Sequence, residues 1–323
     1  MPRKWQRLSL TELAVGLGSL MVIAIVALAL VSAGCLRQQE IEVWRKQMGN
    51  ISLLLAEQTR QCMASSYLAL DGIAEEVNGA GADTEGEFRK LLATPQTFRM
   101  LKKKTQFLPH LDVATVVAAN GDVINFTRSF PPPPINLADR EVVQALAAGH
   151  DGETMITPAL RSRGNGRPVF YIGRRIDDRH GNLLGMVLVG TSVDLFTSLY
   201  QRLGENLGSG ASITLYRSDF TILTRWPWSE KALGQSDSAA TRADPGTRQD
   251  ESGVVYLHPT SMSEGGRRVS GIGALRAVPE YPLRISISVT EDLFLHNWHH
   301  MTRGIALISV VFILSLLFGL ASS

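Results

Sequence analysis

The chain has 323 residues, of which 45% are hydrophobic, and it carries a formal net charge of +2 at pH 7. A charge so close to neutral gives no support for a nucleic-acid partner, whose phosphates call for an excess of basic side chains. The two cysteines, Cys35 and Cys62, form no CxxC metal motif, and Cys35 falls in an apolar run. Disulfide-stapled and zinc-stabilised classes are therefore excluded, and ordinary hydrophobic cores must hold the fold together.

Two uncharged apolar runs bracket the chain, at residues 13–36 and 304–321. A bilayer core about 30 Å thick needs about 20 apolar residues of helix to cross it, and both runs meet this length. Three basic residues precede the first run, whereas Glu40 and Glu42 follow it. By the positive-inside rule, residues 1–12 are a cytoplasmic tail and the segment between the two runs lies outside the membrane.

A lipoprotein cleavage site is a competing interpretation of the first run, which contains Ser32, Ala33, Gly34 and Cys35 in sequence. The run is longer than the roughly 7–15 apolar residues of a signal-peptide core. A second membrane helix would also make a lipid anchor redundant. We therefore interpret the first run as a membrane helix.

Residues 37–79 are predicted to continue this helix beyond the membrane as a stalk. Apolar residues recur at spacings of three and four, which is a heptad-like pattern; they are Ile41, Trp44, Met48, Ile51 and Leu55. No proline interrupts residues 37–94. This stripe can pack against its own domain, pair with a second copy, or do each on a different stretch. We expect a homodimer through the stalk helix, with Cys62 as a candidate residue of its seam.

After about Ala93 the pattern changes to short β-like runs separated by turns. The first group has predicted strands at 113–118, 123–126, 154–160, 168–176 and 183–191, and predicted helices at 137–148 and 193–203. The second group has predicted strands at 212–216, 221–225, 254–259, 269–278 and 283–289, a polar loop at 237–250, and a helix at 291–301. The repeated order predicts two α+β units with antiparallel sheets, a membrane-distal unit at 80–204 and a membrane-proximal unit at 205–300.

Four phrases in this segment are typical of one family, and they occur in a fixed order. They are Asn136-Leu137-Ala138-Asp139-Arg140, Gly173-Arg174-Arg175-Ile176, Thr224-Arg225-Trp226-Pro227 and Pro279-Glu280-Tyr281-Pro282-Leu283. With them, residues 37–303 resemble the double Cache extracellular sensors, especially those of bacterial diguanylate cyclases. The resemblance implies two tandem PAS-like Cache units on a long N-terminal helix, flanked by two transmembrane helices. It also implies a bacterial inner-membrane protein with a periplasmic main domain, a small ligand in the distal unit, and a dimer.

The resemblance also implies candidate ligand residues. In the amino-acid-binding version of the fold, an arginine, a Trp-Tyr pair and a later aspartate hold the ligand. Arg140 takes the place of that arginine, but Val142 and Val143 replace the aromatic pair. Ser192 falls near the place of the aspartate, and Asp194 follows two residues later. An arginine can hold a carboxylate or phosphate through two parallel hydrogen bonds, so an anionic ligand group is expected without the full amino-acid cage.

Six arginines crowd the later strands and turns of the first unit: Arg161, Arg163, Arg167, Arg174, Arg175 and Arg179. Converging guanidinium groups could attract an anionic ligand or a lipid headgroup. Alternatively, they are edge charges that protect a hairpin from aggregation. Tyr171 beside them is either core or pocket wall. The candidate ligand-binding residues are Asp139, Arg140, Arg161, Tyr171, Arg174, Ser192 and Asp194.

Enzyme motifs are missing from the sequence. It contains no glycine-rich phosphate loop, nucleophile elbow or kinase motif, so we predict no catalytic residue and no cofactor in this chain. His296, His299 and His300 cluster on one predicted helix. They are either metal ligands or residues above the membrane surface, and without added Cys, Asp or Glu we favour the second interpretation and predict no metal.

The predicted function is therefore the periplasmic ligand-sensing half of a receptor. The resemblance favours a diguanylate cyclase, which signals through cyclic-di-GMP, with an output domain expected after Ser323. One alternative is the sensor part of a chemoreceptor or histidine kinase. The other is a membrane-tethered binding protein that acts through a partner.

Overall fold

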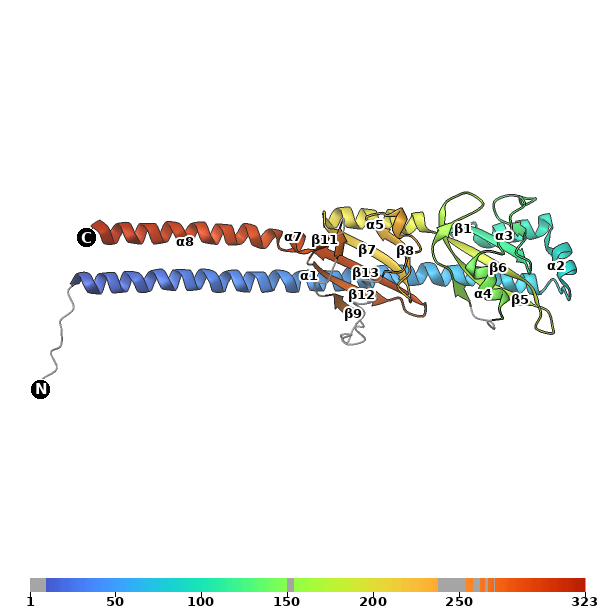
Figure 1. Cartoon of the computed structure of the whole chain (residues 1–323), viewed down its shortest axis with the longest axis horizontal. Helices are drawn as coiled ribbons and strands as arrows, with labels where there is room; N and C mark the ends of the chain where they lie inside the picture. Colours follow the sequence, from blue (N-terminus) through green and yellow to red (C-terminus); the bar gives the residue numbers. More distant parts are fainter. Residues whose placement is uncertain are drawn as a thin grey trace, which may run out of the picture.

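The computed structural model describes residues 10–149, 154–237, 254–257, 262–264, 267–269 and 271–322. Its architecture is elongated, with two mixed helix-and-sheet units following one another along a single long helix (Figure 1). Two helices project together from one end of this arrangement. We call the unit farther from the projecting helices the distal unit and the nearer one the proximal unit.

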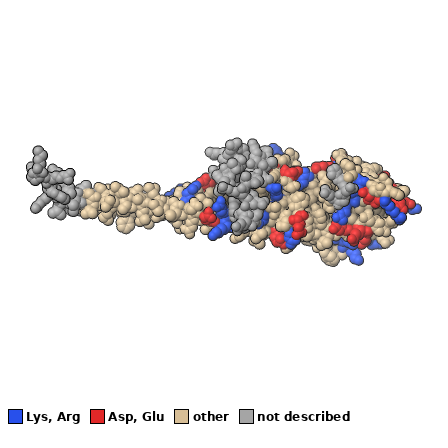
Figure 2. All heavy atoms as spheres, turned by 90° about the horizontal axis from the view of Figure 1, so that it is seen from below, with Lys and Arg blue, Asp and Glu red and all other residues tan. Residues whose placement is uncertain are grey.

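The projecting helices are the start of α1 (Leu10–Asn78) and α8 (His296–Ser322). Both are long and apolar enough, by length and composition, to cross a membrane, and neither apolar window is buried inside the protein. Figure 2 shows no basic or acidic side chains along most of their length, in contrast to the two units. Exposed apolar surface of this extent calls for a bilayer around it.

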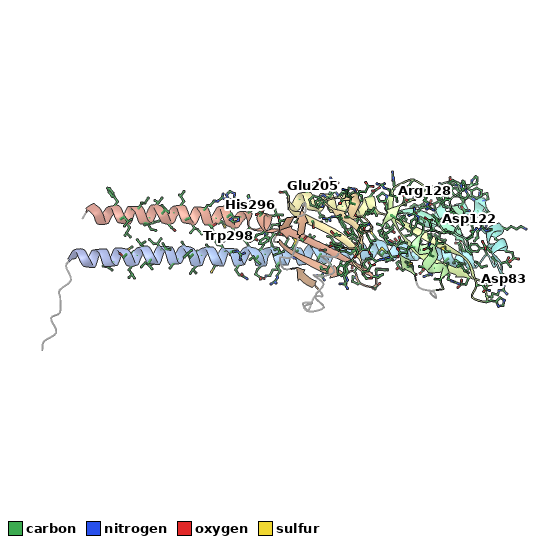
Figure 3. The ribbon with its side chains drawn as sticks, in the orientation of Figure 1. Asp83, Asp122, Arg128, Glu205, His296 and Trp298 are labelled. Carbon is green, nitrogen blue, oxygen red and sulfur yellow. The ribbon has the colours of Figure 1, made fainter. Side chains whose placement is uncertain are left out.

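The two helices are joined where they leave the proximal unit. The indole Nε1 of Trp298 donates to the carbonyl oxygen of Ala33 over 2.8 Å, and Asn297 Nδ2 donates to Glu40 Oε1 over 2.9 Å. Figure 3 shows Trp298 and His296 at this junction. These bonds hold the first turn of α8 against α1 at the end of its apolar run.

The distal unit contains helices on both faces of one antiparallel sheet. Its helices are α2 (Glu85–Leu92), α3 (Pro95–Thr105) and α4 (Glu141–Ala147), and α5 (Val193–Leu207) leads out of it. Its strands are β1 (Leu111–Ala118), β2 (Val123–Phe126), β3 (Met155–Ile156), β4 (Leu160–Arg161), β5 (Pro168–Asp177) and β6 (Leu183–Ser192). The sheet order is β2-β1-β6-β5-β3, and β4 also pairs with β5.

The proximal unit repeats this plan. Its strands are β7 (Ala211–Arg217), β8 (Ile222–Trp226), β9 (Val254–Leu257), β10 (Met262–Glu264), β11 (Arg267–Val269), β12 (Gly271–Ala277) and β13 (Leu283–Thr290). The short helices η1 (Glu230–Ala232) and α7 (Glu291–Phe294) complete it. The sheet order is β8-β7-β13-β12-β9, while β10 and β11 pair separately. In both units the first hairpin lies beside the last strand, as the predicted tandem repeat requires.

Three local predictions need correction. Residues after Ala93 do not turn directly to strands: Thr94 caps α3 by accepting from the Thr97 N–H, and Pro95 occupies the first helical turn, where its missing N–H costs nothing. The helix predicted at 137–148 begins later, after Arg140. The strand predicted at 154–160 is split into β3 and β4 around Pro158. All but the first residue of the predicted loop 237–250 lies outside the described residues.

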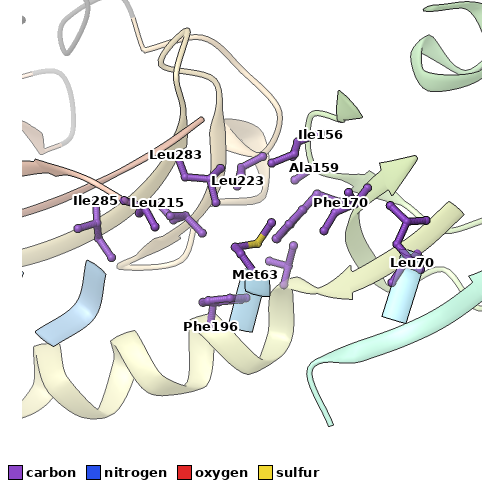
Figure 4. Close-up of a cluster of buried hydrophobic side chains, with 14 of the residues drawn as sticks. Met63, Leu70, Ile156, Ala159, Phe170, Phe196, Leu215, Leu223, Leu283 and Ile285 are labelled. Atoms are coloured by element: carbon purple, nitrogen blue, oxygen red, sulfur yellow. The ribbon is translucent and has the colours of Figure 1, made fainter. Parts of the chain in front are cut away.

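The heptad-like stripe of α1 packs against its own sheets. Met48 and Leu55 are buried, and Ile41, Trp44 and Ile51 pack against the same core. That core is continuous from one unit to the other, and its side chains include Met63, Ile156, Phe170, Phe196 and Leu223 (Figure 4). The intramolecular interpretation of this stripe is therefore confirmed.

Candidate functional site

The two faces of the distal sheet differ in what covers them. On β5, Phe170 and Ile172 face the core around α1, whereas Tyr171 belongs to the cluster under α4. Gly173 lies on the α4 side, where an added Cβ would come within 2.9 Å of Leu146 and 2.8 Å of Val142. This glycine lets α4 pack close to the sheet, so the beginning of the helix is held over the same face as Tyr171.

A half-buried polar cluster lies on this face. The Arg128 guanidinium pairs with the Asp112 carboxylate, and their side chains are 19% and 11% exposed (Figure 3 labels Arg128). Arg128 Nη1 also donates to Ser162 Oγ over 3.0 Å. The Tyr171 hydroxyl donates to the same Ser162 Oγ at 3.4 Å. Four side chains from β1, β5 and two connecting segments thus meet in one network.

Arginines from the loops surround this cluster. Arg140, the residue before α4, donates from Nη2 to the carbonyl oxygen of Arg161 over 3.2 Å. The Arg161 side chain turns away to Glu230 of the proximal unit and to the Gly166 carbonyl. Arg163 donates to the Asp139 carboxylate over 2.6 Å. Arg161 and Arg163 thus each have an acidic partner, whereas no ion pair joins Arg140 to an acidic side chain among the described residues.

Electrostatics connect these groups. Burial raises the pKa of the Tyr171 phenol, and the charges of Arg128 and Arg140 oppose that rise, so both guanidinium groups act on the hydroxyl. The hydrogen bond from Arg163 lowers the pKa of the Asp139 carboxyl. Asp139 therefore stays ionised and forms an ion pair with Arg163, whereas the charge of Arg140 acts on the same carboxylate without a direct ion pair. Such an arrangement can hold a carboxylate or phosphate.

Three of the predicted site residues lie elsewhere. Arg174 projects from the opposite face of β5 and pairs with Asp71 of α1 over 2.7 Å. Ser192 precedes α5, where its backbone N–H donates to the His110 carbonyl oxygen over 2.8 Å. Asp194 is exposed in the first turn of α5. The structure thus groups Asp139, Arg140, Arg161 and Tyr171, and separates these three from them.

Two of the other crowded arginines form ion pairs. Arg175 pairs with Asp177 over 2.6 Å and donates to the carbonyl of Leu146 at the end of α4. Arg179 pairs with Asp83 over 3.2 Å. The edge-charge interpretation fits Arg179, which is 79% exposed, whereas Arg175 is only 11% exposed and holds the end of α4.

Sequence reasoning missed Asp112, Arg128 and Ser162. The register of the β1–β2 hairpin pairs Thr115 with Phe126. Extended beyond β2, it sets Asp112 opposite Ser129, one residue past Arg128, so it brings the two residues into one neighbourhood without pairing them. Ser162 carries no comparable signal, since it comes from a connecting segment.

The segments that cover the site are also joined to the proximal unit. Arg217 of β7 contacts Glu141, the first residue of α4, with 3.4 Å between Nη1 and Oε1. The same nitrogen donates to the Ile156 carbonyl of β3 over 3.2 Å. Together with the contact between Arg161 and Glu230, these bonds link both α4 and the β3–β4 segment to the proximal unit.

The histidines above the junction form ring contacts. The His296 and His300 rings are 4.9 Å apart between centroids, and His299 is equally close to Trp298. Within the described part of the chain, no group of three or more His, Cys, Asp or Glu side chains is arranged to hold a metal ion.

Comparison with known proteins supports the fold. The extracellular domain of rpHK1S-Z16, described as a histidine kinase, superimposes with a TM-score of 0.63 and 23% identity, covering 78% of this chain and 96% of that one. The ligand-binding domain of Mlp24 with asparagine gives a TM-score of 0.54 at 12% identity over 80% and 98% of the chains. The domain of the Pseudomonas aeruginosa PAO1 chemoreceptor PctB with L-Gln gives 0.52 at 14% identity over 77% and 91%.

No protein-family model matches this sequence, and no curated protein matches it. The structural neighbours are extracellular ligand-binding sensor domains of chemoreceptors and histidine kinases. The chain therefore shares the fold of these extracellular domains, and two helices of the described chain are long and apolar enough to cross a membrane.

Proposed function

We propose that this chain is the ligand-sensing region of a bacterial inner-membrane receptor. In this proposal α1 and α8 cross the membrane, the N-terminus is cytoplasmic, and both units lie in the periplasm. The positive flank before the first apolar run supports the orientation. The Cache-like fold, which amino-acid chemoreceptors share, supports the sensing role.

The ligand that we propose is a small molecule with a carboxylate or similar anionic group, bound over the distal sheet beside Arg140 and Tyr171. The observation that carries this proposal is Arg140 itself. Its guanidinium has no acidic partner among the described residues, yet it acts on a largely buried phenol. A bound anion would give Arg140 a direct ion-pair partner. Val142 and Val143 are buried against the sheet, so no Trp-Tyr pair is available at those positions to enclose an ammonium group.

Replacing Arg140 with alanine is expected to weaken ligand binding about 10- to 100-fold, because hydrogen bonds to a charged group contribute about 1.5–3 kcal/mol. The full chain in lipid nanodiscs would be screened by thermal shift against amino acids and small carboxylates. Arg179→Ala is the matched control, since Arg179 lies on the hairpin at the far end of the unit and is 79% exposed. Equal affinities of the wild-type and Arg140→Ala chains for every ligand found would remove Arg140 from the site.

Ligand binding would signal by shifting α1 and α8 relative to each other. A ligand can drive this shift only if it binds two conformational states with different affinities. In this proposal the two states differ in the bonds that Arg217 and Arg161 make between the units. For the output we propose cyclic-di-GMP synthesis, from the sequence resemblance. Control of a histidine kinase or chemoreceptor is the second candidate, because those proteins share the fold. Receptor purified from native membranes would distinguish them by GTP conversion to cyclic-di-GMP or by autophosphorylation.

We further propose that the receptor is a homodimer through the outward face of α1. Leu54 and Leu68 of α1 are 69% and 71% exposed, which is unusual for leucine side chains outside the apolar run. Gln61 is exposed midway between them, so the three residues follow the seven-residue spacing of a helical seam. Cys62 is not on this face: it packs against the core, and burial raises the pKa of its thiol. A second copy would cover the exposed leucines.

Mild oxidation of a Gln61→Cys chain, with Cys35 and Cys62 replaced by serine, is expected to give mostly disulfide-linked dimer on non-reducing gels. Two cysteines facing each other across a helical seam meet the distance that a disulfide needs. Gln201→Cys in the same background is the control, because Gln201 is exposed on α5. Equal, low crosslinking of both variants would count against the seam.

A further inference from the structure

One face of the proximal sheet carries polar side chains that the proposed signalling role does not use, beside an apolar cluster that includes Tyr216 and Leu275. Leu215 and Ile285 face the core around α1. Because successive side chains of a strand alternate between faces, their neighbours Thr214 and Ser286 lie on the other side of the sheet. There the strand pairing sets residues in rows. One row runs from Arg225 to Thr214 to Ser286 across β8, β7 and β13.

The neighbouring row is equally polar. It runs from Ser212 to Ser288 to Gly273, and the hydroxyl oxygens of Ser212 and Ser288 are 3.1 Å apart. The two rows are two residues apart along each strand, which is about 7 Å, so their side chains are within reach of one small molecule. Gly273 is buried and contributes no side chain, and the row continues from it to Leu257 of β9. A hydroxyl-lined patch of this kind suits a ligand rich in oxygen atoms.

Arg225 is the unusual member of this face. Its Nε is buried and has no hydrogen-bond partner, and no ion pair joins its guanidinium to any other described residue. On the next strand, Arg217 shows the ordinary arrangement, with two of its nitrogens on the Asp219 carboxylate. A partly buried charge without a partner is costly, and a bound anion would supply the counter-charge.

The surroundings of Arg225 favour an anion. The Tyr216 hydroxyl donates to Asp237 Oδ2 over 2.9 Å, which engages that carboxylate. Burial raises the pKa of Tyr216 and the charge of Arg225 opposes the rise, so the two side chains lie within electrostatic reach. Arg284, paired with Tyr216 in the register, adds a second guanidinium whose carbon lies 4.9 Å from the centre of the Phe220 ring.

We infer that the proximal unit contains a second ligand site, built on Arg225 with Thr214, Ser286, Ser212 and Ser288, for a small carboxylate that also carries hydroxyl groups. Arg225 would hold the carboxylate through two parallel hydrogen bonds, and the serine and threonine hydroxyls would bond to the ligand's hydroxyl groups. This site does not depend on the distal one, because none of its residues contacts Arg140 or Tyr171 in the described chain.

The test uses the full chain in lipid nanodiscs with L-malate as the probe, inorganic phosphate as a second anion, and sodium chloride at equal ionic strength. Malate is expected to raise the melting temperature of the wild-type chain in a saturable way, by about 5 °C at a hundred times its Kd. Arg225→Met should lower the affinity for malate at least tenfold while its melting temperature without anions stays equal or rises, because an unpaired charge is removed. Arg202→Met, an exposed arginine of α5, should behave like the wild type.

The outcomes separate the possibilities. A malate response that survives in Arg140→Ala and is lost in Arg225→Met supports the proximal site. Phosphate acting as well as malate would show a general oxyanion site and overturn the assignment to hydroxylated carboxylates. Three results would each overturn the proposal. The first is normal malate binding by Arg225→Met, and the second is a clear drop in the melting temperature of that variant without anions. The third is the absence of a saturable response in the wild-type chain.

Discussion

Replacing Phe170 with alanine is expected to lower the free energy of unfolding by about 3–5 kcal/mol, the usual cost of emptying a buried aromatic site. Phe170 has no exposed surface, and its ring lies 6.3 Å from that of Phe196. The side chain belongs to the core that joins the two units, beside Ile156 and Leu223 (Figure 4). Surrounding side chains come from several elements and cannot all collapse into the space left behind.

Urea denaturation of the chain in lipid nanodiscs, followed by far-UV circular dichroism, would measure this loss. The matched control is Phe107→Ala, the same chemical change at a side chain that is 83% exposed. We expect it to change the free energy of unfolding by less than about 0.5 kcal/mol. Similar values for the two variants would show that the core between the units is not packed as described.

Arg128→Met is expected to cost about 2–3 kcal/mol of unfolding free energy. Removing one member of a buried ion pair costs about 3–5 kcal/mol because the other charge is left unpaired, and the slight exposure of this pair places the value lower. Asp112 would lose its guanidinium partner, and Ser162 would lose the hydrogen bond that orients it toward Tyr171. Ligand affinity at the distal site should fall as well.

The control for this change is the exposed pair of Arg163 with Asp139, whose side chains are 39% and 63% exposed. Arg163→Met should cost less than about 1 kcal/mol, since solvent screens exposed pairs. The same urea titration gives both values. A loss at Arg128 no larger than the loss at Arg163 would mean that the polar cluster does not stabilise the distal unit.

The strands were the most predictable part of the fold. Runs rich in valine and isoleucine around Gly121 and Gly181, both with positive φ, gave hairpins that the structure confirms. The helices α2 and α3 were missed because they are short and charged, so capping residues such as Thr84 and Thr94 define them more than apolar periodicity does. Their positions depend on packing against β1 and β2.

The candidate site was less predictable. Tyr171 and Arg174 are three residues apart on one strand, so the two-residue alternation of side chains places them on opposite faces of the sheet. The sequence prediction treated them as one cluster and was wrong on this point. The ion pair of Asp112 with Arg128 and the role of Ser162 depend on where two connecting segments cross the sheet. Apolar patterning does not encode such crossings. Arg140 was singled out through the family resemblance rather than through any local pattern.

Hydrogen–deuterium exchange of the full chain in lipid nanodiscs, with and without the tightest ligand found in the screen, tests the central claim most directly. The account predicts slower exchange in α4 and β3–β4, over the face that carries Tyr171, and loss of this protection in Arg140→Ala. Protection confined to other parts of the chain, or protection unchanged in Arg140→Ala, would contradict a ligand site over the distal sheet.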